Sequence, residues 1–310
     1  MITIYKSMES GVEKVNDVIS GCWINVVDPT TDEIERLTLL DIPQDFVTSP
    51  LDIDERARTE REDDGTMLIL LRIPYFQGAK MDVPYTTIPL GIILKDSYIV
   101  TVCRRSTDIL QEFMNGRVRG FSTGKRYRFV IQILHHTAVR YLSFLREINH
   151  TVDALEDQLQ LSMQNKEVME LLKYQKSLVY FTTALKSNEL MLERLQRSQT
   201  LRMYPDDEDL LEDTIIENQQ AIEMVNISNN ILSSMMDAFA SIISNNLNVV
   251  MKFLTSVTIV LSIPAIVTSF FGMNVTLPFA DHPLAYMIII GVFLGLMGLV
   301  VFIFMKRHWF

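Results

Sequence analysis

Apolar residues are distributed unevenly along the chain and are concentrated in its last 60 positions. Residues 253–271 and 284–305 form runs of 19 and 22 residues without a charge. Each run meets the ~20 apolar residues that a helix needs to cross a hydrocarbon core. Buried core helices are the alternative interpretation, but runs of this length and apolarity are typical of membrane spans. The pattern therefore predicts two transmembrane helices at the C-terminus, after about 245 residues of ordinary soluble composition.

The first 125 residues mix strand and helix signals and predict a cytoplasmic α/β domain. Runs rich in β-branched and aromatic residues predict strands at 1–5, 22–27, 67–75, 85–94 and 98–103. Helices are expected at about 31–40 and near 109–115. The segment 52–65 is dense in charge and is expected to be a solvated loop. The order of the strands in the sheet does not follow from the sequence.

Residues 126–204 have a helical pattern and predict an antiparallel hairpin. Apolar residues recur at three- and four-residue spacing through Leu145, Ile148, Val152, Leu155 and Leu159. Gln164 and Asn165 interrupt this pattern, and a second helix is expected from about 166 to 199. His135 and His136 are adjacent within the first helix, so they point to different faces and are not expected to bind a metal.

A third helix is expected to begin at Pro205 and to continue into the first span, because the next proline is Pro264. At 1.5 Å per residue, a helix over 206–271 would be roughly 100 Å long. Such a helix needs partners along its length, most simply copies of itself. We divide the rest of the chain into a stalk helix at 205–250, transmembrane helix 1 at 251–272, an extracytoplasmic loop at 273–283, transmembrane helix 2 at 284–305 and a tail at 306–310.

The basic tail sets the expected orientation in the membrane. Lys306, Arg307 and His308 follow the second span, and positive residues favour the cytoplasmic side. Two spans then place the N-terminal residues in the cytoplasm too. We expect a multi-pass protein of the cell membrane with both termini cytoplasmic.

Composition narrows the possible functions. The net charge of −10 argues against a nucleic-acid partner and is compatible with attracting cations. Cys22 and Cys103 lack metal-ligand spacing and suggest a reducing compartment. The sequence has no phosphate loop, no nucleophile elbow and no cluster of His or Cys ligands. We therefore expect neither an enzyme nor an organic cofactor.

One face of the long helix is mostly small or polar through its C-terminal half. Steps of four and three residues from Asp237 meet mostly small or polar residues, and we call this line the polar seam: Asp237, Ser241, Ser244, Asn248, Met251, Thr255, Thr258, Ser262, Ala265, Ser269 and Gly272. A 3.5-residue repeat keeps one face toward a supercoil axis. Such a seam suits either close packing of small residues or a water-lined pore. Asp237 and Asn248 favour the pore, because buried polar groups are costly when dry.

The end of the first span carries the motif Phe271-Gly272-Met273-Asn274. An aromatic residue followed by Gly-Met-Asn, at the end of the first of two C-terminal spans, resembles the signature of the CorA family of divalent-cation channels. Phe271 stands where many relatives have Tyr. The basic C-terminus and the stretch containing Ser244, Asn245, Asn248, Met251 and Lys252 also resemble this family. The likeness covers the whole chain in architecture and is specific over about 237–310.

The resemblance implies an α+β membrane protein that forms a homopentameric funnel around a central pore. Gly272, Met273 and Asn274 would form the selectivity filter, with Asn274 as its outer ring. Along the pore, the polar seam would contribute Asp237, Asn248, Met251, Thr255, Thr258, Ser262 and Ser269. Mg²⁺ would be the transported ion and would also regulate the channel. Other possibilities are a Zn²⁺, Co²⁺ or Ni²⁺ transporter of the same superfamily and a non-conducting membrane scaffold.

The regulatory site departs from the family pattern. Asp213 matches a position that the family uses for regulatory Mg²⁺ between subunits. Ungapped comparison places Ser49 at the partner position, with Asp52 and Asp54 just beyond. Alternatively, Asp213 is only one of several acids that suit the start of a helix. In the exit loop, where many relatives carry an acid, only Asp281 is available.

Overall fold

A mixed seven-stranded sheet lies at the centre of the N-terminal part of the computed structural model, which describes residues 1–9, 11–95, 97–162, 165–198, 204–273 and 284–307. The order is β2-β1-β3-β7-β6-β5-β4, and β3 and β7 are the parallel pair. The strands are β1 Ile2–Met8, β2 Gly11–Val15, β3 Trp23–Val27, β4 Arg58–Arg61, β5 Met67–Phe76, β6 Tyr85–Lys95 and β7 Tyr98–Cys103.

The five strands predicted from the sequence are confirmed, whereas β2 and β4 were missed. Both missed strands lie at the edges of the sheet. The prediction of a solvated loop over 52–65 is wrong for Arg58–Arg61, which pairs with β5 in the register Thr59 to Ile69. Charged residues are characteristic of edge strands, because one edge has no strand partner and charge discourages further pairing. The apolar alternation that identifies a strand is therefore weak in these two.

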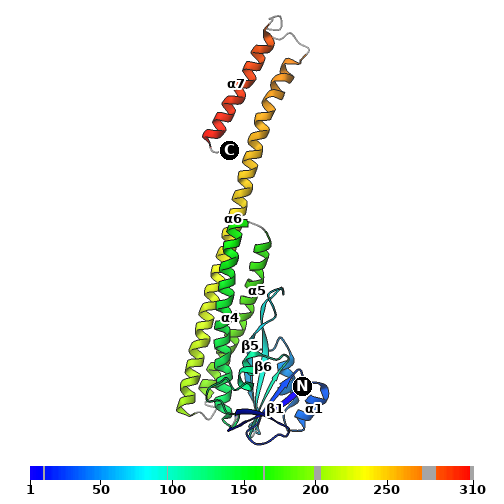
Figure 1. Cartoon of the computed structure of the whole chain (residues 1–310), viewed down its shortest axis with the longest axis vertical. Coiled ribbons are helices and arrows are strands. Elements are labelled where there is room, and N and C mark those ends of the chain that lie inside the picture. Colours follow the sequence, from blue (N-terminus) through cyan, green and yellow to red (C-terminus); the bar gives the residue numbers. More distant parts are fainter. Residues whose placement is uncertain (10, 96, 163–164, 199–203, 274–283, 308–310) are drawn as a thin grey trace. The chain divides into compact units, whose positions relative to one another are not determined.

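Helices cover both faces of the sheet (Figure 1). On one face lie α1 Thr31–Thr38, α2 Gln44–Thr48 and the 3₁₀ turn η1 Ser49–Leu51. On the other lie α3 Asp108–Met114, α4 Arg126–Ser162 and α5 Asn165–Ser198. Alternate residues of β5 enter the two cores, so Leu68 packs with the first group and Ile69 with the second. This period of two is what a strand buried on both faces requires.

The helices α4 and α5 form the predicted antiparallel hairpin, and α6 Pro205–Phe271 is the predicted long helix of 67 residues. The chain divides into two compact units, Met1–Ser234 and Met235–Phe310, and α6 contributes to both. In the first unit α6 bonds to both hairpin helices. Ser228 Oγ donates to Asn149 Oδ1 at 2.7 Å, and Asn218 Nδ2 donates to the carbonyl of Leu185 at 3.3 Å.

The second unit contains the C-terminal part of α6 and α7 Ala285–Lys306. Two helices of the described chain are long and apolar enough to cross a membrane, α6 and the segment Tyr286–Lys306. Figure 1 shows α7 running alongside the C-terminal part of α6. Only 6% and 0% of their most apolar windows are buried within the single chain, so their surfaces are available to lipid or to other helices.

The turn η1 packs unusually closely against the sheet. A Cβ added at Gly91 in β6 would overlap Cγ of Pro50 and lie 3.0 Å from its Cβ. Since the proline ring and the sheet are both rigid, we expect Gly91→Ala to lower the stability of the protein by about 1–3 kcal/mol, the usual cost of overpacking. Thermal unfolding of the full chain in detergent would measure this. Gly298→Ala is the control, because a Cβ there meets no atom within 4 Å, and equal midpoints for both variants would contradict the prediction.

Candidate functional site

The polar seam lies on an open face of α6. Asp237, Asn248, Met251, Thr255, Thr258 and Ser269 are exposed in the single chain, and Ser262 is half-buried. The covered face contains Ser256, which is fully buried, and the half-buried residues Val260, Ile263 and Val267. At about 100° per residue these four positions lie nearly opposite the seam. The polar seam is therefore open to further partners or solvent, as are apolar residues such as Leu261 and Ile266, which are 68% and 67% exposed.

The hydroxyl groups of the seam donate back to their own helix. Thr258 Oγ1 donates to the carbonyl of Leu254 and Ser262 Oγ to that of Thr258, each at 2.8 Å. This satisfies the hydroxyl hydrogen without another chain. The oxygen keeps lone pairs that accept hydrogen bonds from water. Ser256 Oγ donates to the carbonyl of Lys252 in the same way at 2.7 Å, so this bonding occurs on both faces of the helix.

At the membrane exit, the structure describes two of the three predicted filter residues. The N–H of Gly272 donates to the carbonyl of Thr268 at 2.9 Å, just past the last residue of α6. Gly272 is exposed, and Met273 is 52% exposed. Asn274 and Asp281 lie outside the described residues, as does the rest of the exit loop to residue 283.

Asp213 is exposed on the first part of α6 and lies within electrostatic range of His135 on α4. Burial lowers the pKa of His135, and His136 lowers it further, whereas Glu217 and Asp213 act in the opposite direction. His136 itself contacts Glu112 through Nδ1 at 3.0 Å. Asp213 thus has a partly buried imidazole nearby in its own chain, together with a second carboxylate one turn along the helix.

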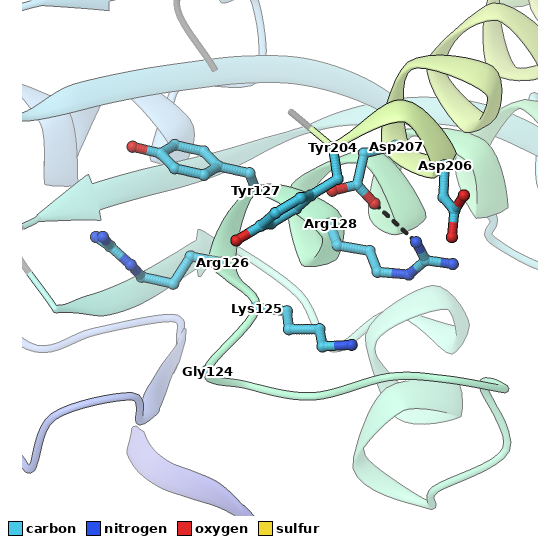
Figure 2. Close-up of a pocket in the computed structure, with 8 residues that line it drawn as sticks. All are labelled: Gly124, Lys125, Arg126, Tyr127, Arg128, Tyr204, Asp206 and Asp207. Carbon is cyan, nitrogen blue, oxygen red and sulfur yellow. Dashed lines mark hydrogen bonds and ion pairs between the residues drawn. The ribbon is translucent and has the colours of Figure 1, made fainter. Parts of the chain in front are cut away.

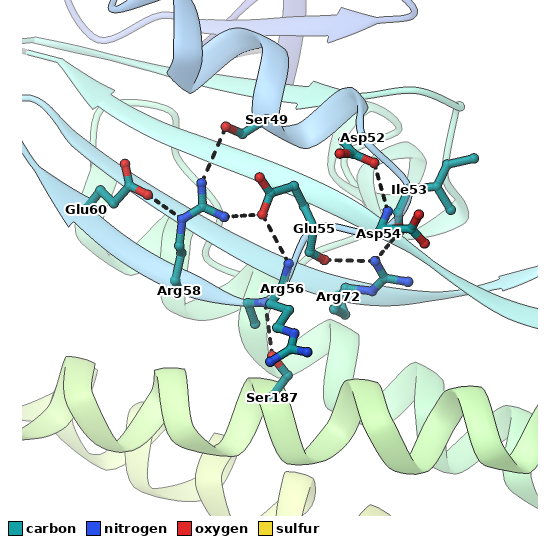
Figure 3. Close-up of polar contacts among 11 residues, drawn as sticks. Ser49, Asp52, Ile53, Asp54, Glu55, Arg56, Arg58, Glu60, Arg72 and Ser187 are labelled. Carbon is teal, nitrogen blue, oxygen red and sulfur yellow. Dashed lines mark hydrogen bonds and ion pairs between the residues drawn. The ribbon is translucent and has the colours of Figure 1, made fainter.

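Asp52 and Asp54 lie on an exposed segment between η1 and β4 that Arg72 holds in place (Figure 3). The Arg72 guanidinium donates to the carbonyls of Ile53 and Glu55, the latter at 2.9 Å. Within the segment, the N–H of Asp54 donates to Asp52 Oδ1 at 3.0 Å. Burial lowers the pKa of Arg72, as expected when a cation leaves water for a site with neutral acceptors.

Arg72 also links this segment to the hairpin helices. Its carbonyl accepts hydrogen bonds from the Tyr141 hydroxyl at 3.0 Å and from Asn188 Nδ2 at 2.7 Å. Its N–H donates to Asn188 Oδ1 at 2.9 Å. Arg72 was not among the residues predicted from the sequence. An arginine inside a predicted strand of apolar residues was the available signal, since a buried guanidinium needs several acceptors.

Ser49 has a cationic environment. Arg58 Nη2 donates to Ser49 Oγ at 3.4 Å, and Arg58 also forms ion pairs with Glu55 and Glu60. A guanidinium beside the hydroxyl disfavours a divalent cation at that position. Of the three residues considered as partners for Asp213, Asp52 and Asp54 are therefore better suited than Ser49.

No three His, Cys, Asp or Glu side chains of the described residues form a group that could hold a metal ion. Asp213 lies on α6, whereas Asp52 and Asp54 belong to the segment before β4. A divalent-cation site built from these acids would have to be completed by a second chain, by backbone oxygens or by water.

A pocket of about 680 Å³ lies where α4 and α6 begin (Figure 2). Its lining includes Lys125, Arg126 and Arg128 together with Tyr127 and Tyr204. This pocket was not predicted from the sequence, although a signal was present. Between Glu112 and Glu147 the chain has no acidic residue, and residues 117–128 contain five Lys or Arg, in a protein whose net charge is −10.

Comparison with known proteins agrees with this architecture over the whole chain. The sequence profile of the family described as CorA-like Mg²⁺ transporter protein matches residues 20–307. The cobalt/magnesium transport protein CorA of Methanocaldococcus jannaschii is 30% identical over 328 aligned residues, which cover 100% of both chains.

Two solved structures show the extent of the shared fold. The complete structure of the CorA magnesium transporter from Methanocaldococcus jannaschii superposes with a TM-score of 0.86 at 24% identity, over 100% of this chain and 99% of that one. The ZntB cytoplasmic domain from Vibrio parahaemolyticus superposes with a TM-score of 0.63 at 11% identity, over 78% of this chain and 98% of that domain. The profile match and the full-length relative show that the chain belongs to the CorA-like Mg²⁺ transporter family of membrane proteins.

Proposed function

We propose that this protein is a homopentameric channel that carries Mg²⁺ across the cell membrane into the cytoplasm. The N-terminal unit and the basic residues Lys306 and Arg307 would face the cytoplasm, in accordance with the positive-inside rule. Residues 273–283 would lie on the opposite side. Five copies of α6 would surround the pore, each turning its polar seam toward the axis.

The exposure of the seam is the observation that carries the proposal. A membrane protein with an outward polar stripe would place the hydroxyl oxygens of Thr255, Thr258, Ser262 and Ser269 against hydrocarbon, where their remaining lone pairs find no donor, at a cost in free energy for each one. Assembly around a water-filled axis removes this cost, because the stripe then faces water. On the opposite face of α6, Ser256 is buried and Val260 is half-buried in the single chain.

Mg²⁺ is the ion that suits an uncharged filter of this kind. Mg²⁺ gives up its water ligands reluctantly, so a selective site must bind the hydrated ion through hydrogen bonds to its waters. A ring of Asn274 side chains would offer carbonyl oxygens without a full charge. Such a site can both bind and release the ion, whereas a ring of carboxylates at the mouth of the pore would hold it too tightly to conduct well.

Two other functions compete with this one. The relative named above is described as a cobalt/magnesium transport protein, so Co²⁺, and with it Ni²⁺ or Zn²⁺, is the alternative cargo. A scaffold that spans the membrane without conducting is the second alternative. No residue of the first span at 253–271 is ionisable, which argues against a proton-coupled carrier.

Growth complementation tests the proposal in cells. Expression in a bacterial strain that lacks its own Mg²⁺ uptake and requires millimolar Mg²⁺ should restore growth at micromolar Mg²⁺. A scaffold would not restore growth. A transporter for Zn²⁺, Co²⁺ or Ni²⁺ alone would increase sensitivity to those ions without relieving the Mg²⁺ requirement.

We further propose that cytoplasmic Mg²⁺ closes the channel by binding between subunits at Asp213, with Asp52 or Asp54 of the neighbouring subunit as partners. Carboxylates that face one another repel unless a cation lies between them. Loss of Mg²⁺ would therefore loosen the closed ring, provided that the closed state binds Mg²⁺ more tightly.

The Asp213→Ala variant should remain conducting at cytoplasmic Mg²⁺ concentrations that close the wild type, with at least a roughly tenfold higher inhibitory concentration, equivalent to ~1.4 kcal/mol. Mg²⁺ flux into liposomes that contain increasing internal Mg²⁺ measures this. Glu212→Ala, which removes an adjacent acid on another face of α6, is the matched control. Unchanged inhibition in Asp213→Ala, and also in Asp52→Ala and Asp54→Ala, would rule out these acids as the sensor.

A further inference from the structure

The pocket at the start of α4 and α6 combines features that recognise a phosphate-bearing ligand. Its lining residues are Gly124, Lys125, Arg126, Tyr127, Arg128, Tyr204, Asp206 and Asp207. All of them belong to the N-terminal unit. The volume of about 680 Å³ is in the range of small-molecule sites in proteins.

The positive charge of this pocket is only partly neutralised by the protein. Arg128 Nη1 pairs with Asp207 Oδ1 at 2.7 Å, and this carboxylate side chain is 5% exposed. In the described part of the chain, neither Lys125 nor Arg126 forms an ion pair with an acidic side chain. The Arg126 guanidinium instead lies over the ring of Tyr127, 5.7 Å from its centroid. Two cationic side chains at the pocket are thus left without a negative partner.

Two cations without an acidic partner are unusual at the start of a helix. Arg126 begins α4, a helix of 37 residues with no acidic residue in its first turn. The start of a helix is the positive end of its dipole and normally attracts Asp or Glu. The first-turn N–H groups also lack partners within the helix. Cations at this position oppose the helix dipole by about 0.3–1 kcal/mol each, and the Asp207 carboxylate pairs with Arg128 alone among them. The N-terminus of a helix with free N–H groups is suited to a phosphate.

The remaining walls of the pocket offer groups that can bind the base and the ribose of a nucleotide. Figure 2 shows the Tyr204 ring between the side chains of Arg126 and Arg128, with Tyr127 on the same side as Arg126. An aromatic ring such as Tyr204 provides a face on which a base can stack. The Asp206 carboxylate, at the opening of α6, can accept hydrogen bonds from ribose hydroxyls. Phosphates would bind at Lys125, Arg126 and the start of α4.

We propose that this pocket binds a nucleoside polyphosphate, with Lys125 and Arg126 as the phosphate-binding side chains and Tyr204 as the base platform. The site is separate from the polar seam and does not depend on ion conduction. Because Asp206 and Asp207 belong to the first turn of α6, a bound nucleotide would contact the start of the helix that we assign to the pore.

Binding of ATP to the full-length protein in detergent, measured calorimetrically with EDTA present, tests this proposal. EDTA removes divalent cations, so that cation sites do not contribute. We expect saturable binding in the millimolar range or tighter, weakened at least tenfold by the double substitution Lys125→Gln/Arg126→Gln. The control is Lys14→Gln/Arg36→Gln, which removes two positive charges from a pocket of about 410 Å³ elsewhere in the same unit.

One further ligand and one further variant separate the contributions of the phosphates and the nucleoside. Tripolyphosphate should bind more weakly than ATP, and Tyr204→Ala should weaken ATP binding while leaving tripolyphosphate binding unchanged. Tyr204 is 77% exposed, so this variant also provides a test if the double variant does not fold. Absence of ATP binding to the wild type, or an equal loss in the control variant, would overturn the proposal. Equal affinity for ATP and tripolyphosphate, with no effect of Tyr204→Ala, would overturn the assignment to a nucleoside.

Discussion

Replacing Asn274 by alanine is expected to abolish selective Mg²⁺ flux while leaving the assembled protein intact. The methyl group removes the acceptor oxygen that each subunit would offer to the waters of the ion. A hydrogen bond of this type contributes about 0.5–1.5 kcal/mol, and tenfold in binding corresponds to ~1.4 kcal/mol. The loss of five such acceptors should therefore reduce the flux to the background of empty liposomes.

Asn246→Ala is the matched control for this prediction, because it removes the same amide from the side of α6 that faces away from the seam. The control should conduct Mg²⁺ at the rate of the wild type. Wild-type flux through a correctly assembled Asn274→Ala protein would remove Asn274 from the filter.

A phenylalanine at Ser262 is expected to stop conduction, whereas a phenylalanine at Val260 should be tolerated. Ser262 lies on the polar seam, so five rings would meet at the axis and close the water-filled path. Val260 lies on the other face of α6, nearly opposite the seam. Both substitutions place a phenylalanine ring in the same turn of the helix, on different faces, which makes them a suitable pair.

Mg²⁺ flux into liposomes, together with the oligomeric mass of each variant, would measure the difference. Both variants should assemble, and only Ser262→Phe should fail to conduct Mg²⁺. If both conduct, or if both fail, the seam is a packing surface and the ion path lies elsewhere.

The long-range architecture could be predicted because it depends on strong periodic signals. The two uncharged runs indicated both spans, and the three- and four-residue spacing from Leu145 to Leu159 indicated the hairpin helix. The absence of proline between Pro205 and Pro264 indicated the uninterrupted course of α6, which the structure gives as Pro205–Phe271. Pro264 itself does not end the helix, since an apolar surrounding favours continued helical hydrogen bonding on both sides of it.

Contacts between residues distant in sequence could not be predicted in this way. The edge strands β2 and β4 lack an apolar alternation. The close contact of Pro50 with Gly91 and the bonds from Arg72 to the Ile53 and Glu55 carbonyls depend on tertiary placement. No single-sequence pattern encodes such contacts.

In the candidate site, too, periodic features could be predicted from the sequence, whereas contacts between distant residues could not. The seam from Asp237 to Gly272 is periodic, so its common face could be predicted from residue spacing alone. The cationic environment of Ser49 requires Arg58 from the next strand, and the basic pocket requires the starts of α4 and α6 to meet. The acid-free stretch between Glu112 and Glu147 was visible in the sequence. The pocket that it lines could not be predicted, because the pocket forms only where α4 and α6 begin side by side.

Uptake of Mg²⁺ by liposomes that contain only the purified protein tests the central claim most directly. Internal Mg²⁺ would be followed with a fluorescent indicator, with Co²⁺ and Zn²⁺ added outside as competitors. We predict rapid Mg²⁺ uptake, driven by an inside-negative potential and retained in the absence of a proton gradient. Absence of Mg²⁺ uptake by the assembled protein, or uptake of Zn²⁺ or Co²⁺ without uptake of Mg²⁺, would contradict a Mg²⁺ channel.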